Sequence, residues 1–298
     1  MILIIILVLI LIIYSISNAS SKSRDLEEYM YIKKICKNKW NLIFTFFSYF
    51  QHNTDINFKY NFSWVMEMGF FRRIEEKYYL TKDEYSKILK RINDYFIPDS
   101  HGFSTICNLY FDTDNYDLVI KSNEKPLYKE KVRLRSYNLP TPDSEVFLEI
   151  KKKYDGVVSK RRVSMKLFDF YNYYYNKKSN INTQIMKEID YTFNYYNLKP
   201  KVYLEYNRLA YYCKDNKEFR LTFDFDIKYR LKELDFSKKY NNLPLLDEEY
   251  FIMEVKTLDS LPIWFTSILS ELKIYPCSFS KYGEVYRRKV KNVWKYFK

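Results

Sequence analysis

The chain has 298 residues, of which 47% are hydrophobic and 20% aromatic, and its formal net charge is +13. It has only four glycines, widely separated, and two histidines, which argues against a glycine-rich phosphate loop, a histidine-based triad and a histidine-rich zinc site. The basic balance implies an anionic partner: a nucleic acid, an acidic membrane surface or a polyanionic small molecule. Four cysteines without a CxxC pair are expected to be free thiols in a reducing compartment.

The N-terminal segment is strongly apolar, because residues 2–13 are all Ile, Leu or Val. No basic residue precedes this run and several follow it. We therefore favour a membrane anchor over residues 1–20 that keeps the rest of the chain in the cytosol. The alternatives are a cleaved signal peptide, which makes the protein secreted or luminal, and a start codon at Met30 or Met66. Residues 21–63 are interpreted as a linker.

Downstream of this linker, alternating apolar and polar residues predict strands over 72–80, 103–112, 125–137, 145–154, 156–165, 201–213, 219–229 and 250–256. A capping box at residues 81–84 begins a first helix, and further helices are predicted over 114–122, 166–176, 183–196, 262–273 and 279–289. Residues 98–102 are predicted to form a loop. These elements predict an α+β fold: an antiparallel β-barrel forming a tunnel, with peripheral helices, because closure of a sheet removes its edges.

The strand over 125–137 places three cations on one face. Lys131, Arg133 and Arg135 alternate with apolar residues, so their side chains point the same way. Cations spaced about 7 Å apart repel one another unless an anion lies across them. This pattern indicates a basic interior filled by an anion rather than a basic outer surface.

The same alternation recurs on other strands, each of which carries at least one cation. The residues that face one way within their strands are Arg73, Glu75 and Lys77; Glu149, Lys151 and Lys153; Lys160 and Arg162; Arg208; Arg220, Thr222 and Asp224; and Glu254 and Lys256. In a single strand, this pattern is typical of a half-buried strand with one solvent-exposed, charged face. Its repetition in several strands predicts that the charged faces converge on the lumen of a barrel. Buried cations must be matched, and a triphosphate or a longer phosphate chain matches them. Nucleic acid is not expected, because its binding needs outward-facing cations.

The carboxylates on these faces suggest a metal. Glu254 with Glu149 could hold Mg²⁺ or Mn²⁺ against phosphate oxygens, since both ions take oxygen ligands. Glu75 is either a further metal ligand or the ion-pair partner of a tunnel arginine.

Ten short motifs follow one another along the chain. They are Glu75-x-Lys77, Leu109-Tyr-Phe-Asp-Thr113, Lys131-Val-Arg-Leu-Arg-Ser-Tyr137, Val146-Phe-Leu-Glu-Ile-Lys151, Lys160-Arg-Arg162, Tyr206-Asn-Arg208, Arg220-Leu-Thr-Phe-Asp224, Met253-Glu-Val-Lys256, Leu261-Pro-x-Trp264 and Phe279-Ser-Lys-Tyr282. In this order they resemble the VTC domain, the catalytic domain of the vacuolar transporter chaperone complex and of bacterial polyphosphate polymerases, which belongs to the triphosphate tunnel metalloenzyme superfamily. The resemblance covers about residues 64–290, followed by a basic tail over 291–298.

The resemblance implies a tunnel that binds ATP and a divalent metal, Mn²⁺ or Mg²⁺, and transfers the γ-phosphate of ATP to a growing polyphosphate chain. It assigns phosphate contacts to Lys77, Arg133, Arg135, Lys151, Lys160, Arg208, Arg220, Lys256 and Lys281. Glu254 matches the metal-binding glutamate of the family. Phosphoryl transfer requires positioning and charge neutralisation more than a protein nucleophile, so a histidine-poor site is adequate.

The sequence departs from the eukaryotic polymerases in three respects. Residues 1–63 are too short for the SPX domain that senses inositol phosphates, and no three apolar helices follow the domain. Ser278 stands where those proteins carry a further basic residue. Some family members have little activity of their own, so the resemblance leaves partner subunits open.

Other residues have structural interpretations. Trp264 and Tyr282 are expected to pack, and Asp112 and Asp114 to serve as turn and N-cap residues. The basic run over 287–289 is interpreted as a solvated face, with contact to anionic lipid or polyphosphate as the alternative. Two further functions stay open: a tunnel hydrolase acting on inorganic triphosphate or an RNA 5′-triphosphate, and a non-catalytic module that binds polyphosphate or inositol phosphate.

Overall fold

The computed structural model describes residues 74–124, 126–155, 157–258 and 260–290, except the side chains of His101 and Val157. The N-terminal anchor, the linker and the basic tail over 291–298 lie outside the described residues, so those predictions are not addressed by the structure. Among the helices that are described, none has both the length and the apolar character needed to cross a membrane.

The described strands form one antiparallel sheet in the order β1-β9-β7-β6-β2-β3-β4-β5, with β8 paired to β7. The strands are β1 (Ile74–Thr81), β2 (Phe96–Asp112), β3 (Tyr128–Tyr137), β4 (Glu145–Tyr154), β5 (Val157–Lys166), β6 (Lys199–Cys213), β7 (Arg220–Arg230), β8 (Leu243–Pro244) and β9 (Tyr250–Thr257). The helices are α4 (Lys82–Ile92), α5 (Asp117–Asn123), α6 (Leu167–Asn176), α7 (Gln184–Tyr196), α8 (Ile263–Glu271) and α9 (Lys281–Val285), followed by the π-helical turn η1 (Tyr286–Val290).

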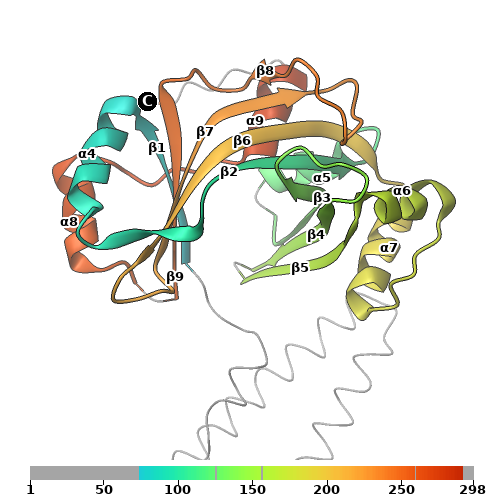
Figure 1. Cartoon of the computed structure of the whole chain (residues 1–298), viewed down its shortest axis with the longest axis horizontal. Helices are drawn as coiled ribbons and strands as arrows, with labels where there is room; N and C mark the ends of the chain where they lie inside the picture. Colours follow the sequence, from blue (N-terminus) through green and yellow to red (C-terminus); the bar gives the residue numbers. More distant parts are fainter. Residues whose placement is uncertain (1–73, 125, 156, 259, 291–298) are drawn as a thin grey trace, which may run out of the picture. The chain divides into compact units, whose positions relative to one another are not determined.

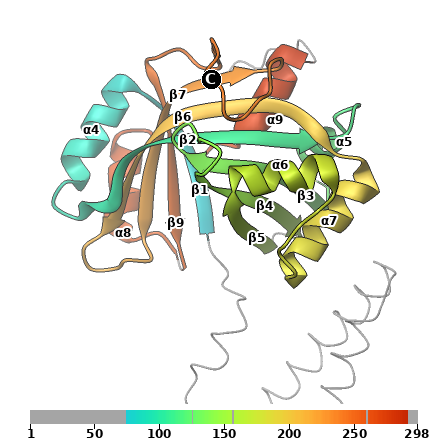
Figure 2. The same cartoon turned by 45° about the vertical axis from the view of Figure 1, so that its right-hand side comes forward.

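The sheet is strongly curved, so that its two ends turn toward each other (Figures 1 and 2). Its terminal strands β1 and β5 do not pair with each other through their backbones. The approach is instead bridged by side chains, because Lys151 Nζ of β4 lies 3.4 Å from Glu75 Oε2 of β1. The predicted antiparallel α+β tunnel fold is confirmed, with the difference that the sheet is not closed into a barrel, because β1 and β5 form no hydrogen-bond ladder with each other.

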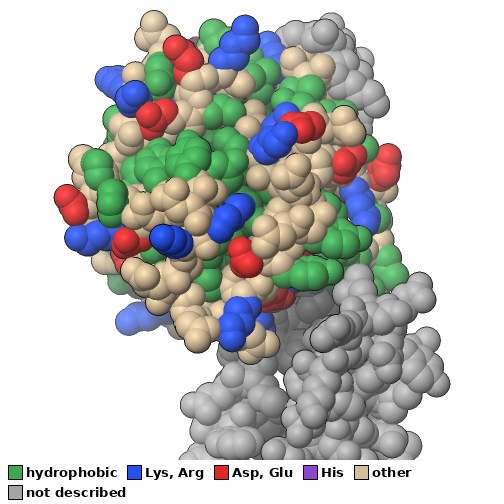
Figure 3. Space-filling view, turned by 90° about the vertical axis from the view of Figure 1, so that its right-hand side faces the viewer, with side chains coloured by type: hydrophobic (Ala, Val, Ile, Leu, Met, Phe, Trp, Pro, Cys, Tyr) green, Lys and Arg blue, Asp and Glu red, His purple; other side chains and the backbone are tan. Residues whose placement is uncertain are grey.

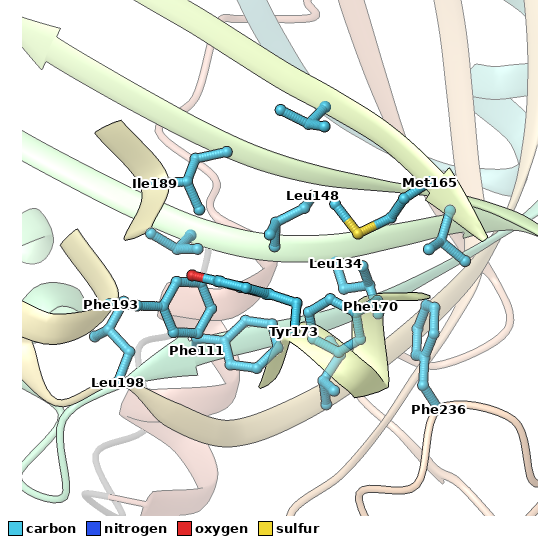
Figure 4. Close-up of a cluster of buried hydrophobic side chains, with 14 of the residues drawn as sticks. Phe111, Leu134, Leu148, Met165, Phe170, Tyr173, Ile189, Phe193, Leu198 and Phe236 are labelled. Carbon is cyan, nitrogen blue, oxygen red and sulfur yellow. The ribbon is translucent and has the colours of Figure 1, made fainter. Parts of the chain in front are cut away.

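Helices α4, α6, α7 and α8 cover the outer face of this curved sheet, whereas α5 and α9 pack in a third apolar cluster with residues of β2 and β6. Apolar residues of β2 to β5, such as Leu134 and Leu148, pack against Phe170 of α6 and Phe193 of α7 (Figure 4). A second apolar cluster packs β1, β7 and β9 against α4 and α8. Since side chains alternate along a strand, burying the apolar set on the outside directs the charged set toward the inner, concave face.

The helices on the β1 side begin and pack as expected. The side chain of Thr81 accepts a hydrogen bond from Glu84 N, and the carboxylate of Glu84 accepts one from Thr81 N at 2.7 Å, which completes the predicted capping box. Trp264 of α8 stacks on Tyr95 with ring centroids 4.0 Å apart and packs against the second cluster. Trp264 is therefore a packing residue.

The loop predicted over 98–102 is wrong, because these residues belong to the long strand β2. Pro98 pairs with Tyr211 of β6, but the next pair joins Phe103 to Leu209, so extra residues of β2 bulge out between them. Gly102 lies within this bulge with a φ of +45°, a value that glycine adopts without strain. Proline and glycine here mark an irregularity inside a strand rather than its end.

Asp112 connects two helices at one end of the sheet. Its carboxylate accepts hydrogen bonds from two backbone N–H groups in the first turn of α5, at 2.9 and 3.0 Å, and from the buried hydroxyl of Tyr282 at 2.7 Å. Asp112 is thus a capping residue, as predicted, and it also holds α9. Asp114 has a different role, since it pairs with Lys199 at 2.6 Å.

Residues 276–280 carry the chain across the open side of the sheet into α9. Cys277 N donates to the carbonyl oxygen of Lys77 at 2.7 Å, and Lys77 Nζ donates to the carbonyl oxygen of Phe279 at 3.2 Å. Pro276 forms an isolated bridge with Tyr78. This segment attaches to β1 and thereby positions Ser280 and Lys281 over the inner face.

Candidate functional site

The inner face gathers charged side chains from strands that are far apart in the sequence. Nine basic side chains gather there with four carboxylates, so basic groups outnumber acidic groups by five. The cations are Lys77, Lys131, Arg133, Arg135, Lys151, Lys160, Arg208, Lys256 and Lys281, and the carboxylates are Glu75, Glu149, Asp224 and Glu254. By contrast, the outer surface on the α6 and α7 side mixes both signs of charge among apolar and polar side chains (Figure 3).

Glu149 of β4 is surrounded by three of these cations. Its side chain is only 2% exposed, and its oxygens lie 2.7 Å from Arg133 Nε, 3.8 Å from Arg135 Nε and 2.8 Å from Lys160 Nζ. Burial alone would raise the pKa of Glu149, but the three cations outweigh it and lower that pKa to about 2. Burial lowers the pKa of Lys160 to about 8 in spite of this partner. The ionised carboxylate therefore holds the guanidinium group of Arg133, and Arg135, beside it, donates a hydrogen bond from Nε to Asn108 Oδ1 at 3.0 Å.

Asp224 of β7 has the same function further along the sheet. It is fully buried and accepts a bidentate pair of hydrogen bonds from Arg208, at 2.6 and 2.8 Å, and a third from Lys281 of α9. Burial would raise the pKa of Asp224, but the two cations lower it to about 2. The ammonium group of Lys281 also lies 4.3 Å from the ring centroid of Tyr206, a cation–π contact.

Glu75 and Glu254 lie on the neighbouring strands β1 and β9. In the strand register, Glu75 is opposite Lys256 and Lys77 is opposite Glu254. Glu254 contacts Lys256, whereas Glu75 lies 3.5 Å from Lys77 Nζ and 3.4 Å from Lys151 Nζ. Burial acts to raise the pKa of both carboxyl groups, and the surrounding lysines and arginines hold the pKa values below their usual range.

A cavity of about 750 Å³ extends the inner face toward α5 and residues 276–280. Six cations line it: Lys77, Lys129, Lys131, Lys151, Lys153 and Arg287. Lys131 differs from the residues of the Glu149 and Asp224 clusters, because its Nζ donates to the neutral hydroxyl of Ser280 at 2.9 Å and has no carboxylate within ion-pair distance among the described residues.

Two predicted features lie elsewhere. Arg220 begins β7 at the rim, where its side chain is exposed and its Nε donates to the carbonyl oxygen of Lys217 at 3.3 Å. It shares a face with Asp224 but joins neither carboxylate cluster. The basic run over 287–289 is not simply a solvated face, because Arg287 and Arg288 both pair with the fully buried Glu284.

The carboxylates fit a divalent metal only in part. The described residues contain no group of three or more His, Cys, Asp or Glu side chains that could hold an ion by themselves. Glu254 and Glu75 are close enough for their charges to interact, and two carboxylates plus phosphate oxygens and water form a common Mg²⁺ shell. Glu149 does not fit, because three cations already contact its oxygens.

Three groups at the site were not assigned from the sequence. Alternation placed Asp224 on the polar face of its strand, but nothing in the spacing identified it as the shared partner of Arg208 and Lys281. Lys131 stood in the most basic strand without a separate role, and Ser280 is brought to it by a chain crossing between residues far apart in sequence. No local sequence pattern indicates that Lys131 and Ser280 are in contact.

Comparison with solved structures gives matches of low identity. A candidate adenylate cyclase from Bacillus halodurans is 13% identical, with 75% of this chain and 97% of that chain covered and a TM-score of 0.45. A protein from Pyrococcus horikoshii is 15% identical, with 73% and 99% covered and a TM-score of 0.38. The triphosphatase of the Mimivirus capping enzyme is 11% identical, with 71% and 95% covered and a TM-score of 0.30. These TM-scores are too low to carry an argument.

The comparison with protein families identifies the family of this chain, because the match extends over most of the chain. No curated protein sequence matches the chain. The model of the VTC domain family matches residues 72–288, more than two thirds of the chain, and that range contains all nine inner-face cations and all four carboxylates. The chain therefore belongs to the VTC domain family.

Proposed function

We propose that this protein is an ATP-dependent polyphosphate polymerase, which transfers the γ-phosphate of ATP to a growing polyphosphate chain within its tunnel. One observation carries the proposal: the inner face holds nine cations against four carboxylates, and three of these carboxylates, Glu149, Asp224 and Glu254, are buried among the cations. Such a face is poorly stable without an anion, since buried charge must be matched. Membership of the VTC domain family supports a role in phosphoryl transfer.

The arginines are placed to hold phosphate oxygens. Glu149 accepts a hydrogen bond from Arg133, Asn108 accepts one from Arg135 Nε at 3.0 Å, and Asp224 accepts two from Arg208. These contacts occupy part of the hydrogen-bonding capacity of the three arginines and leave further N–H groups for a ligand. A guanidinium group held in this way loses little conformational freedom when phosphate binds, and it matches phosphate geometry with two parallel hydrogen bonds. The lysines add positive charge along the path of the phosphate chain.

The transfer itself needs no protein nucleophile. An oxygen of the terminal phosphate of the chain forms a bond to the γ-phosphorus, the bond from that phosphorus to the bridging oxygen breaks, and ADP leaves with the electron pair. The acceptor oxygen is already anionic, so no base has to remove a proton. The residues of the inner face align the two phosphates and neutralise the charge that develops between them.

A divalent ion, Mn²⁺ or Mg²⁺, when bound, would neutralise phosphate oxygens. Glu254, with Glu75 beside it, is the residue we assign to hold that ion. Membrane attachment through the N-terminal run, a cytosolic catalytic domain and partner subunits stay predictions.

The test is to incubate the full chain with ATP and Mn²⁺ and to separate the products on a gel. Polyphosphate of increasing length supports the proposal. Orthophosphate released from ATP or from tripolyphosphate without chain growth would select a tunnel hydrolase. Tight binding of polyphosphate or inositol phosphate without turnover would select a non-catalytic binding module.

A further inference from the structure

We propose that Lys131 and Ser280 form a phosphate-binding doublet that takes up a proton when a phosphate chain enters the cavity beside it. The inference rests on the proposed function for its ligand class, an inorganic phosphate chain. It adds a binding residue and a linkage between binding and pH.

The first step is that the Lys131 ammonium has no compensating anion. Its Nζ donates to Ser280 Oγ at 2.9 Å, and that hydroxyl oxygen also accepts a hydrogen bond from Gly283 N at 3.1 Å, as the N-cap of α9. A neutral hydroxyl cannot offset a half-buried positive charge. A neutral amine keeps an N–H for the same bond, so the contact with Ser280 persists in either protonation state.

The second step is that cations face Lys131 from several elements. Lys77 of β1, Lys129 and Arg133 of β3 and Lys151 of β4 all act electrostatically on its amine. Lys151 is also its direct partner in the strand register. The further titratable groups of the cavity wall, beyond the carboxylates, are Lys153, Cys277 and Arg287.

The third step is that the carboxylates of the cavity are engaged elsewhere. Glu75 contacts Lys77 and Lys151, whereas Glu76 and Glu130 accept hydrogen bonds from neighbouring tyrosines. None of them is within ion-pair distance of the Lys131 amine. Burial first, and then the neighbouring cations, lower the pKa of Lys131 to about 7.

A phosphate chain reverses this balance. Negative oxygens in the cavity favour the ammonium form, so the amine becomes protonated as the ligand binds. At pH 8 a group whose pKa rises from about 7 to well above 8 takes up about one proton. Binding then weakens by up to about tenfold for each pH unit above neutrality, because the proton has to be supplied from solution.

Isothermal titration calorimetry of the full chain with inorganic tripolyphosphate tests the proposal. Titrations at pH 8 in buffers of different ionisation enthalpy give the number of protons exchanged, which includes any protons that the ligand itself releases. In Lys131→Arg the side chain is charged at all accessible pH values, so the variant should bind while taking up about one proton fewer than the wild type. In Lys131→Met, which cannot be protonated, the count should fall equally and the affinity should also fall.

Lys77→Arg is the matched control. It lines the same cavity, but Glu254 and Glu75 overcome the effect of its burial and raise the pKa of Lys77, so it is already protonated and its proton count should equal that of the wild type. An unchanged count in both Lys131 variants would overturn the inference and leave the polymerase proposal intact. A wild type that does not bind tripolyphosphate would overturn both. Normal proton linkage without polyphosphate synthesis would contradict only the polymerase.

Discussion

Two regions of the inner face solve the problem of buried positive charge in different ways. Around Glu149 and Asp224, each cation is held by a buried carboxylate within hydrogen-bond or ion-pair distance. Around Lys131 the cations face one another, and the amine relies on a serine hydroxyl. The first region keeps its geometry without a ligand, whereas the second reaches its full charge only when an anion is present. The comparison separates pre-organised binding from ligand-dependent binding within one tunnel.

The largest expected effect is a loss of stability on removing the negative charge of Asp224, in the region where carboxylates pair with the cations. Asp224→Asn leaves Arg208 and Lys281 buried without their partner, which should lower the free energy of unfolding by about 3–5 kcal/mol. Chemical denaturation measures this loss. The control Asp226→Asn removes a carboxylate on the same strand that is 33% exposed and pairs with Lys228, so it should cost less than about 1 kcal/mol. Equal losses in the two variants would mean that Asp224 does not organise the site.

The next effect is on turnover rather than stability. Arg133→Ala removes a guanidinium group that Glu149 and Tyr110 hold in place, and polyphosphate formation from ATP should fall about a hundredfold or more. Arg161→Ala is a matched control on the adjacent strand, because Arg161 pairs with Glu188 outside the tunnel. Synthesis at the wild-type rate by Arg133→Ala would remove the pre-organised region from the mechanism.

Acid stability tests the comparison, because the region around Glu149 and Asp224 depends on two buried carboxyl groups whose pKa values are lowered to about 2. The pKa of Glu149 falls from 4.5 to about 2 on folding, so the unfolded state binds more protons between these values. The stability that Glu149 contributes is present above pH 4.5 and should be lost as the pH falls toward 2, by about 3 kcal/mol. Denaturation curves from pH 7 to pH 3 should therefore slope less for Glu149→Gln than for the wild type.

The smallest effect is expected at the rim. Arg220 is exposed and contacts a backbone carbonyl rather than an inner carboxylate, so Arg220→Ala should reduce polyphosphate formation by no more than about threefold. A loss as large as that of Arg133→Ala would show that the phosphate-binding part of the tunnel extends beyond the Glu149 and Asp224 clusters to Arg220. Steady-state rates of the two variants, measured side by side, decide this.

Much of the fold follows from local sequence signals. The strand alternation over 125–137 and 145–154 predicted which residues share a face, and β3 and β4 pair so that Arg133 meets Glu149. The capping box at Thr81 predicted the start of α4. These features depend on residues that are close in sequence or on the two-residue alternation of side chains along a strand, and both can be read from the sequence alone.

Contacts across the tunnel could not be predicted in the same way. The pairing of Asp224 with Lys281 depends on how residues 276–280 cross the sheet. The bulge in β2 could not be told from a loop, because proline and glycine are typical of both. Glu149 was expected to hold a metal, but the number of cations that converge on one carboxylate is set by sheet curvature. The curvature of the sheet and the path of the chain across it depend on the whole sheet and cannot be read from a short motif.

Protection of lysines from an amine-modifying reagent tests the central claim most directly. Lys151 and Lys160 of the inner face are 40% and 41% exposed, and Lys87 and Lys166 of the outer face are 55% and 61% exposed, so all four should react. We predict that tripolyphosphate slows modification of the inner pair and leaves the outer pair unchanged. Equal protection of both pairs, or protection of the outer pair alone, would contradict a phosphate chain bound inside the tunnel.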